Sequence, residues 1–322
     1  MTSFYNNPLR LAVFICLLSI FSLRAHGQEH DTAKPVGTAM RNIHYHFTDT
    51  IDISIASLDG KLVPQGNHEF PVFDDSGSFA LAIDTAEMSI SADAMTHLLN
   101  DYTFAKIDAP LKKLSVSISG GTIKVKGVLH SKGDLPFESE GAITVTPDGL
   151  LRIHATKIKA AHLPAKGIMD LFGIEISDLV KTNKVQGLKV DKDDLILDPQ
   201  QLFPPPAIRG RVSTVSLEGN NIRLTFGKPQ QGKWAPLGNV RNYMSYRGGT
   251  LRFGKLTMAD TDLTLIDEDQ RDPFDFYLSH YQKQLVAGYS KTTPQSGLLV
   301  YMPDYGKIRM ARAKATDRKL GK

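Results

Sequence analysis

Alternation of apolar and polar positions runs along most of this chain and predicts β-strands. In residues 51–55 isoleucine alternates with polar residues, and in residues 114–119 apolar residues alternate with serine. A period of two places one kind of side chain on each face of a strand. Gly120-Gly121 follows the second segment and has the composition of a tight hairpin turn. We therefore expect a series of antiparallel hairpins within residues 41–305.

Helical spacing of apolar residues is confined to a few segments. It predicts a helix over residues 91–104, which Ser91 can cap, and a second helix over residues 273–287. Residues 165–182 are the most apolar stretch of the chain after its N-terminal run, and they read as two short helices joined through Gly173. The short helices either plug one end of a sheet as ordinary core or line an apolar cavity.

The regular turn spacing and low helical content predict a mainly β (α+β) fold. Its centre is a large, strongly curved antiparallel sheet that buries one face. Such a sheet can close as a barrel, stack as a sandwich or wrap around the helix at residues 91–104. We expect a single β-rich domain over residues 41–305.

The N-terminus changes this picture by predicting export. Arg10 precedes the uncharged apolar run 11–23, and Ala25-His26-Gly27 has the small residues of a cleavage site. We interpret residues 1–27 as a signal peptide, with an uncleaved anchor as the alternative, and expect a periplasmic or extracellular protein that can contact a membrane peripherally.

The segments that flank the domain are polar. Residues 28–40 read as a flexible leader and residues 306–322 as a basic disordered tail. The whole chain carries a net charge of +4, and loss of two signal-peptide arginines would leave about +2. Because this is far from the basic field of a nucleic-acid binder, we expect no nucleic-acid partner. Cys16, the only cysteine, would leave with the signal, so thiolate chemistry is not expected.

We find none of the usual catalytic motifs, and we expect no enzyme, cofactor or metal site. His44 and His46 share one face of a strand and could hold a metal ion, but a third ligand does not lie nearby in the sequence. Carboxylates are dense between residues 260 and 275, where we favour a solvated turn over a calcium site.

The order of segments between residues 91 and 218 resembles the LmeA-like phospholipid-binding family of exported bacterial proteins. The matching segments are the helix with Leu98-Leu99-Asn100, then IDAPLKKLSVSISGGTIKVKG, LPFESEGAITVTPDGLLRIHATKIKA, LPAKGIMDLFGIEISDLV, GLKVDKDDLILDP and IRGRVSTVSLEG. The resemblance implies a tubular-lipid-binding type of shell, in which a curved sheet wraps one long helix. It also implies a non-enzymatic phospholipid binder or carrier of the cell envelope.

The sequence therefore predicts a lipid carrier whose partner is a phospholipid or another acyl lipid. The candidate lining residues, chosen for their apolarity, are Met95, Leu98, Leu99, Ile168, Leu171, Phe172, Ile174 and Leu179. One alternative is an envelope scaffold protein with a packed core. The other is a hydrolase that combines distant residues, such as His280 with Asp275 or Asp272.

Overall fold

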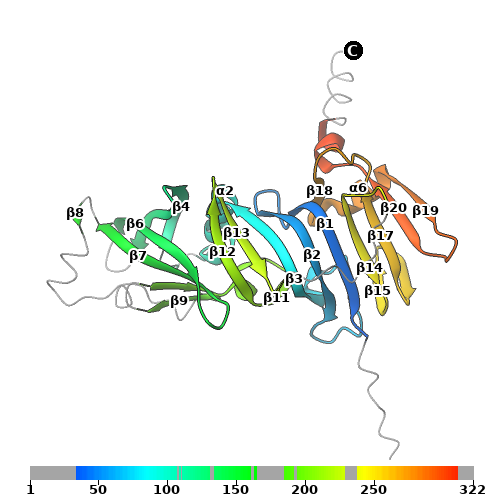
Figure 1. Cartoon of the computed structure of the whole chain (residues 1–322), viewed down its shortest axis with the longest axis horizontal. Helices are drawn as coiled ribbons and strands as arrows, with labels where there is room; N and C mark the ends of the chain where they lie inside the picture. Colours follow the sequence, from blue (N-terminus) through cyan, green and yellow to red (C-terminus); the bar gives the residue numbers. More distant parts are fainter. Residues whose placement is uncertain are drawn as a thin grey trace, which may run out of the picture. The chain divides into compact units, whose positions relative to one another are not determined.

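The fold is mainly β and contains a curled antiparallel sheet that forms a half-barrel, as a computed structural model shows (Figure 1). The described residues belong to one compact unit, which spans Ala33–Lys322. The structure describes residues 34–106, 109, 111–130, 134–160, 163–164, 185–191, 194–228 and 238–310.

The larger sheet has eleven strands, in the order β12-β13-β3-β2-β1-β14-β17-β20-β19, with β11 beside β3 and β18 beside β1. Its strands are β1 (Val36–His46), β2 (Asp52–Pro64), β3 (Phe79–Ser91), β11 (Ala207–Arg209), β12 (Val212–Glu218), β13 (Asn221–Phe226), β14 (Tyr243–Arg247), β17 (Asp262–Asp267), β18 (Phe274–Tyr277), β19 (Tyr289–Thr292) and β20 (Leu298–Met302). Three of its pairings are parallel: β1 with β18, β3 with β11, and β17 with β20. The long strands β1, β2 and β3 lie side by side (Figure 1).

Strand β1 changes its partner halfway along one edge. Gly37–Arg41 pairs with β14, whereas Ile43–His46 pairs with β18. Between the two segments lies Asn42, with a φ of 52°. Asparagine tolerates this left-handed conformation better than most residues. The local twist at Asn42 therefore frees the end of β1 for a second partner.

The second sheet has seven strands, in the order β4-β5-β6-β7-β10-β9, with β8 beside β7. Its strands are β4 (Leu111–Ser119), β5 (Thr122–His130), β6 (Asp134–Val145), β7 (Leu151–Ala160), β8 (Leu163–Pro164), β9 (Leu188–Asp191) and β10 (Asp194–Leu197). Gly120 and Gly121 join β4 to β5 with φ values of 60° and 73°, as a two-residue hairpin turn requires. A separate hairpin consists of β15 (Thr250–Phe253) and β16 (Leu256–Ala259).

The helical elements are short. They are η1 (Ser76–Ser78), α2 (Ala92–His97), η2 (Leu98–Thr103), α5 (Pro199–Leu202), η4 (Leu278–His280) and α6 (Tyr281–Ala287), and residues 305–310 are helical as well. The predicted cap is confirmed, because the Ser91 hydroxyl accepts from the Ala94 amide at 3.0 Å. The predicted helix is α2 continued by the π-helical η2, and the described residues contain no single long helix. No helix among them is both long and apolar enough to cross a membrane.

Two side chains of this helical segment hydrogen-bond the backbone of β4 in place of a neighbouring strand. The Asn100 amide donates to the Leu114 carbonyl at 2.8 Å and accepts from the Leu114 N–H at 2.9 Å. The Thr96 hydroxyl accepts from the Val116 N–H at 2.9 Å. These bonds satisfy backbone groups at the β4 edge and fix the helical segment against the seven-stranded sheet.

We expect Asn100→Ala to lower the free energy of unfolding by about 2 kcal/mol, since both backbone groups of Leu114 lose their partner. Urea denaturation followed by circular dichroism would measure the change. Asn221→Ala removes an exposed amide of the same size and should change the free energy by less than about 0.5 kcal/mol. Equal effects of the two substitutions would rule out the proposed role of Asn100.

Several predicted boundaries need correction. Residues 36–40 of the predicted leader belong to β1, because Val36, Ala39 and Met40 are buried between β2 and β14. The predicted helix 273–287 begins with strand β18, whose phenylalanines at 274 and 276 are both buried. Residues 306–310 of the predicted tail are helical. Residues 1–33 and 311–322, which hold the signal segment and the remaining parts of the leader and tail apart from residues 34 and 35, lie outside the described residues.

The sequence predicted a single large sheet, whereas the described residues form two sheets and a separate two-stranded hairpin. A period of two predicts strands but carries no information on which strands pair.

Candidate functional site

The helical segment α2–η2 and the seven-stranded sheet enclose an apolar cavity of about 40 Å³. Met95 and Leu99 line it from the helical side, and Leu114, Val116 and Ile123 from strands β4 and β5. Ile222 of β13 closes it on the side of the larger sheet. Every lining residue has an aliphatic, thioether or phenyl side chain, so the space excludes polar ligands and favours hydrocarbon.

The structure places three of the predicted lining residues. Met95 and Leu99 lie on the cavity, whereas Leu98 is fully buried in the core beside it. Ile168, Leu171, Phe172, Ile174 and Leu179 lie outside the described residues. The cavity is much smaller than the roughly 300–1,000 Å³ of ligand pockets, so an acyl chain could enter only if the helical segment moved away from the sheet.

A second candidate site lies at the end of β1, where two histidines meet an aspartate from a distant part of the chain. His44 and His46 project from the same face of β1, two residues apart. The parallel pairing with β18 places Asp275 opposite His44. Ligand atoms from the three side chains all lie within 4.8 Å of one another, and no other such group occurs among the described residues.

Short polar contacts connect the three side chains. His46 Nε2 lies 2.7 Å from Asp275 Oδ1, and His44 Nδ1 lies 3.4 Å from the same oxygen. The second nitrogen of His44, Nε2, contacts Asp52 Oδ1 on β2 at 2.9 Å. The His46 ring stacks on Tyr277 at a centroid distance of 3.8 Å. His46 Nδ1 is buried and has no hydrogen-bond partner among the described residues.

The carboxylates shift the protonation of the cluster. Hydrogen bonds to Asp275 and Asp52 raise the pKa of His44 to about 9. Burial acts to raise the pKa of Asp275, but hydrogen bonds from His44 and His46 outweigh burial and lower that pKa. Without a bound ion the cluster therefore holds a proton on His44 at neutral pH.

The arrangement of His280 differs from the pairing considered for a hydrolase. His280 Nε2 lies 3.4 Å from Asp49, and the His280 ring packs on Tyr305 at 4.5 Å. Asp275 instead contacts the two histidines of β1, and the Asp272 carbonyl accepts a hydrogen bond from Asn242. The sequence showed both histidines of the candidate site. It could not show Asp275, which meets His44 only through the pairing of β1 with β18.

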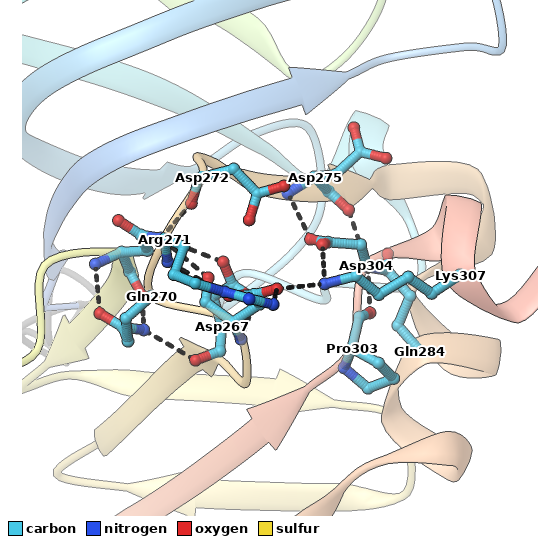
Figure 2. Close-up of polar contacts among 11 residues, drawn as sticks. Asp267, Gln270, Arg271, Asp272, Asp275, Gln284, Pro303, Asp304 and Lys307 are labelled. Carbon is cyan, nitrogen blue, oxygen red and sulfur yellow. Dashed lines mark hydrogen bonds and ion pairs between the residues drawn. The ribbon is translucent and has the colours of Figure 1, made fainter.

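The acidic turn after β17 forms a network of buried and partly buried polar groups rather than the solvated turn we expected. Asp267 is only 1% exposed, and its carboxylate accepts from the Asn242 amide at 3.1 Å and from the Asp269 N–H at 2.9 Å. Lys307 bridges Asp269 at 2.8 Å and Asp304 at 2.9 Å, and Figure 2 shows the contact with Asp304. Burial raises the pKa of Asp267 to about 7, although both hydrogen bonds oppose the rise.

This network holds the backbone that carries Asp275. The Asp304 carboxylate accepts from the Asp275 N–H at 3.0 Å, and the Gln284 amide donates to the Asp275 carbonyl at 2.9 Å and to the Pro303 carbonyl at 3.0 Å (Figure 2). The chain on both sides of the Asp275 side chain is therefore fixed, which orients its carboxylate toward β1.

In comparisons with known proteins, no family model, no curated protein and no solved structure matches this chain. The resemblance to the LmeA-like family thus stays a prediction.

Proposed function

We propose that this chain is an exported, non-enzymatic lipid-binding or lipid-carrier protein of the cell envelope. The observation that supports the proposal is the cavity between α2–η2 and the seven-stranded sheet, whose lining is entirely apolar. Met95 and Leu99, chosen from sequence alone, both contribute to that lining. The apolar N-terminal run at residues 11–23 supports export.

In this proposal the β-strands curve around the helical segment α2–η2 as a shell. Acyl chains enter between α2–η2 and the seven-stranded sheet. Each methylene group transferred from water to such an interior contributes about 0.8 kcal/mol. The π-helical geometry of η2 supports a functional role for this segment, because π-helical turns are often found at functional sites. In this proposal the apolar stretch 165–182 would supply the remaining wall. Exposed lysines of the seven-stranded sheet, such as Lys126 and Lys159, would allow peripheral contact with an anionic membrane.

The small volume of the cavity favours one alternative, an envelope scaffold protein with a packed interior. A packed core predicts that the purified chain carries no lipid and takes none from vesicles. The two functions therefore differ in one measurable quantity, the amount of bound lipid per chain.

We expect organic extraction of the purified full chain, together with native mass spectrometry, to find a phospholipid at close to one molecule per chain. Leu171→Ser combined with Phe172→Ser should lower the bound lipid at least about fivefold, because two hydroxyl groups would replace apolar wall. Val286→Ser changes a side chain that is 85% exposed and should leave the lipid content unchanged. A lipid-free wild-type chain that takes up no phospholipid from vesicles would support the scaffold instead.

A further inference from the structure

We propose that His44, His46 and Asp275 form a binding site for one divalent transition-metal ion, with Zn²⁺ as the best-suited ion. The site does not depend on lipid binding, since its residues lie at the ends of β1 and β18 and do not line the apolar cavity. The three side chains supply two imidazole nitrogens and one carboxylate oxygen. Neutral imidazole and carboxylate ligands of this kind suit zinc.

The donor atoms lie close enough together to share one ion after small side-chain movements. Metal–ligand bonds of about 2.1 Å at tetrahedral angles place neighbouring ligand atoms about 3.4 Å apart. His44 Nδ1 and Asp275 Oδ1 are 3.4 Å apart, and His46 Nε2 and Asp275 Oδ1 are 2.7 Å apart. With every pair of ligand atoms within 4.8 Å, side-chain movements of about 1 Å bring all three into range of one ion.

Asp52 gives the site the outer partner that metal-bound histidines usually have. A ligating imidazole commonly donates its other N–H to a carboxylate, which fixes the tautomer and the ring orientation. When His44 binds through Nδ1, its Nε2–H faces Asp52 Oδ1 at 2.9 Å. The second histidine is positioned differently, by stacking of its ring on Tyr277.

Charge and access also favour a cation. The Asp52 and Asp275 carboxylates bring two negative charges to a pair of imidazoles, and a divalent ion would balance both. The His44 side chain is 39% exposed, whereas that of His46 is 7% exposed. One side of the site is thus open to solvent, so a water molecule can complete a tetrahedral set.

Other histidine–aspartate contacts of this chain lack these features. His154 Nδ1 lies 2.7 Å from Asp194 Oδ1 on the seven-stranded sheet, as close as His46 lies to Asp275, but no third potential ligand joins that pair among the described residues. The His154 pair is therefore the matched control for a test of the metal site.

The test is isothermal titration calorimetry, in which Zn²⁺ is added to the full chain after a chelator has removed any bound metal. Absorption spectra of the chain with Co²⁺ serve as a second probe of the site. We expect one Zn²⁺ per chain, a rise in melting temperature with Zn²⁺, and visible Co²⁺ bands of a tetrahedral site. Asp275→Asn and His44→Gln should each weaken Zn²⁺ binding at least about tenfold. Asp52→Asn, which removes only the outer partner, should weaken it about 10–100-fold.

His154→Gln should leave Zn²⁺ affinity unchanged within about twofold. Circular dichroism checks the fold of each variant. Since His44 is partly exposed, His44→Gln keeps the test decisive even if Asp275→Asn fails to fold. The proposal is overturned if folded wild type binds no stoichiometric Zn²⁺, or if Asp275→Asn and His44→Gln bind it as tightly as wild type. In that case the cluster is a hydrogen-bonded contact between β1, β2 and β18.

Discussion

Asn242→Ala is expected to lower the free energy of unfolding by about 3–5 kcal/mol. Asn242 is fully buried, and its amide nitrogen donates to the Asp267 carboxylate at 3.1 Å, the Asp269 carbonyl at 3.2 Å and the Asp272 carbonyl. Its amide oxygen accepts from Asn42 at 2.7 Å. Alanine would leave an Asp267 oxygen and the Asp269 and Asp272 carbonyls without this donor, and unsatisfied buried polar groups are among the most destabilising changes.

Equilibrium denaturation in urea would measure this loss at neutral pH. Asn239 lies three residues away on an exposed turn and provides the control. Asn239→Ala should change the free energy of unfolding by less than about 0.5 kcal/mol. Asn242→Ala should also weaken the proposed Zn²⁺ site, because Asn242 holds the turn that leads into β18. A loss below about 1 kcal/mol for Asn242→Ala would contradict the central role of this amide.

The second large effect is a fall in stability with rising pH that depends on Asp267. Its pKa is raised from an ordinary value of 3.8 to about 7 in the folded chain. Between these values the folded state keeps a proton that the unfolded state has released. Stability from this group is therefore greatest below pH 4 and falls as pH rises toward 7, by about 1.4 kcal/mol per unit and about 4 kcal/mol in total.

Other groups titrate as well, so the test compares wild type with Asp267→Asn at several pH values between about 4 and 8. Both Asp267 oxygens accept hydrogen bonds, so the amide variant loses one acceptor and starts from a lower stability. The informative quantity is the unfolding free energy of wild type minus that of Asp267→Asn, which should decrease by about 3 kcal/mol from pH 4 to pH 7. Parallel pH profiles would show that Asp267 ionises normally.

Taken together, the polar network and the candidate metal site form one chain of contacts. Asn242 and Asp267 hold the turn before β18, while Asp304 and Gln284 hold the backbone of Asp275. Disruption of the network is thus expected to displace the carboxylate that faces His44 and His46.

Local patterns in the sequence determined the elements whose causes are themselves local. The alternation around residues 51–55 and 114–119 is found in β2 and β4, and the Ser91 cap and the Gly120-Gly121 turn are present as expected. Each depends on side chains and dihedral angles within a few residues, so a single chain segment specifies it.

Pairing between distant segments was decided only in the tertiary structure. The alternation in β18 is only four residues long and precedes a helix, so the helical spacing that follows concealed this strand. The buried state of Asp267 was equally hidden, because a run of carboxylates gives no sign of the amide and lysine partners that satisfy it. His44 and His46 could be found from their spacing in one strand, whereas Asp275 reaches them because the twist at Asn42 lets β1 exchange β14 for β18. Chain topology, which places residues more than two hundred positions apart in register, is the physical reason that the site required the structure.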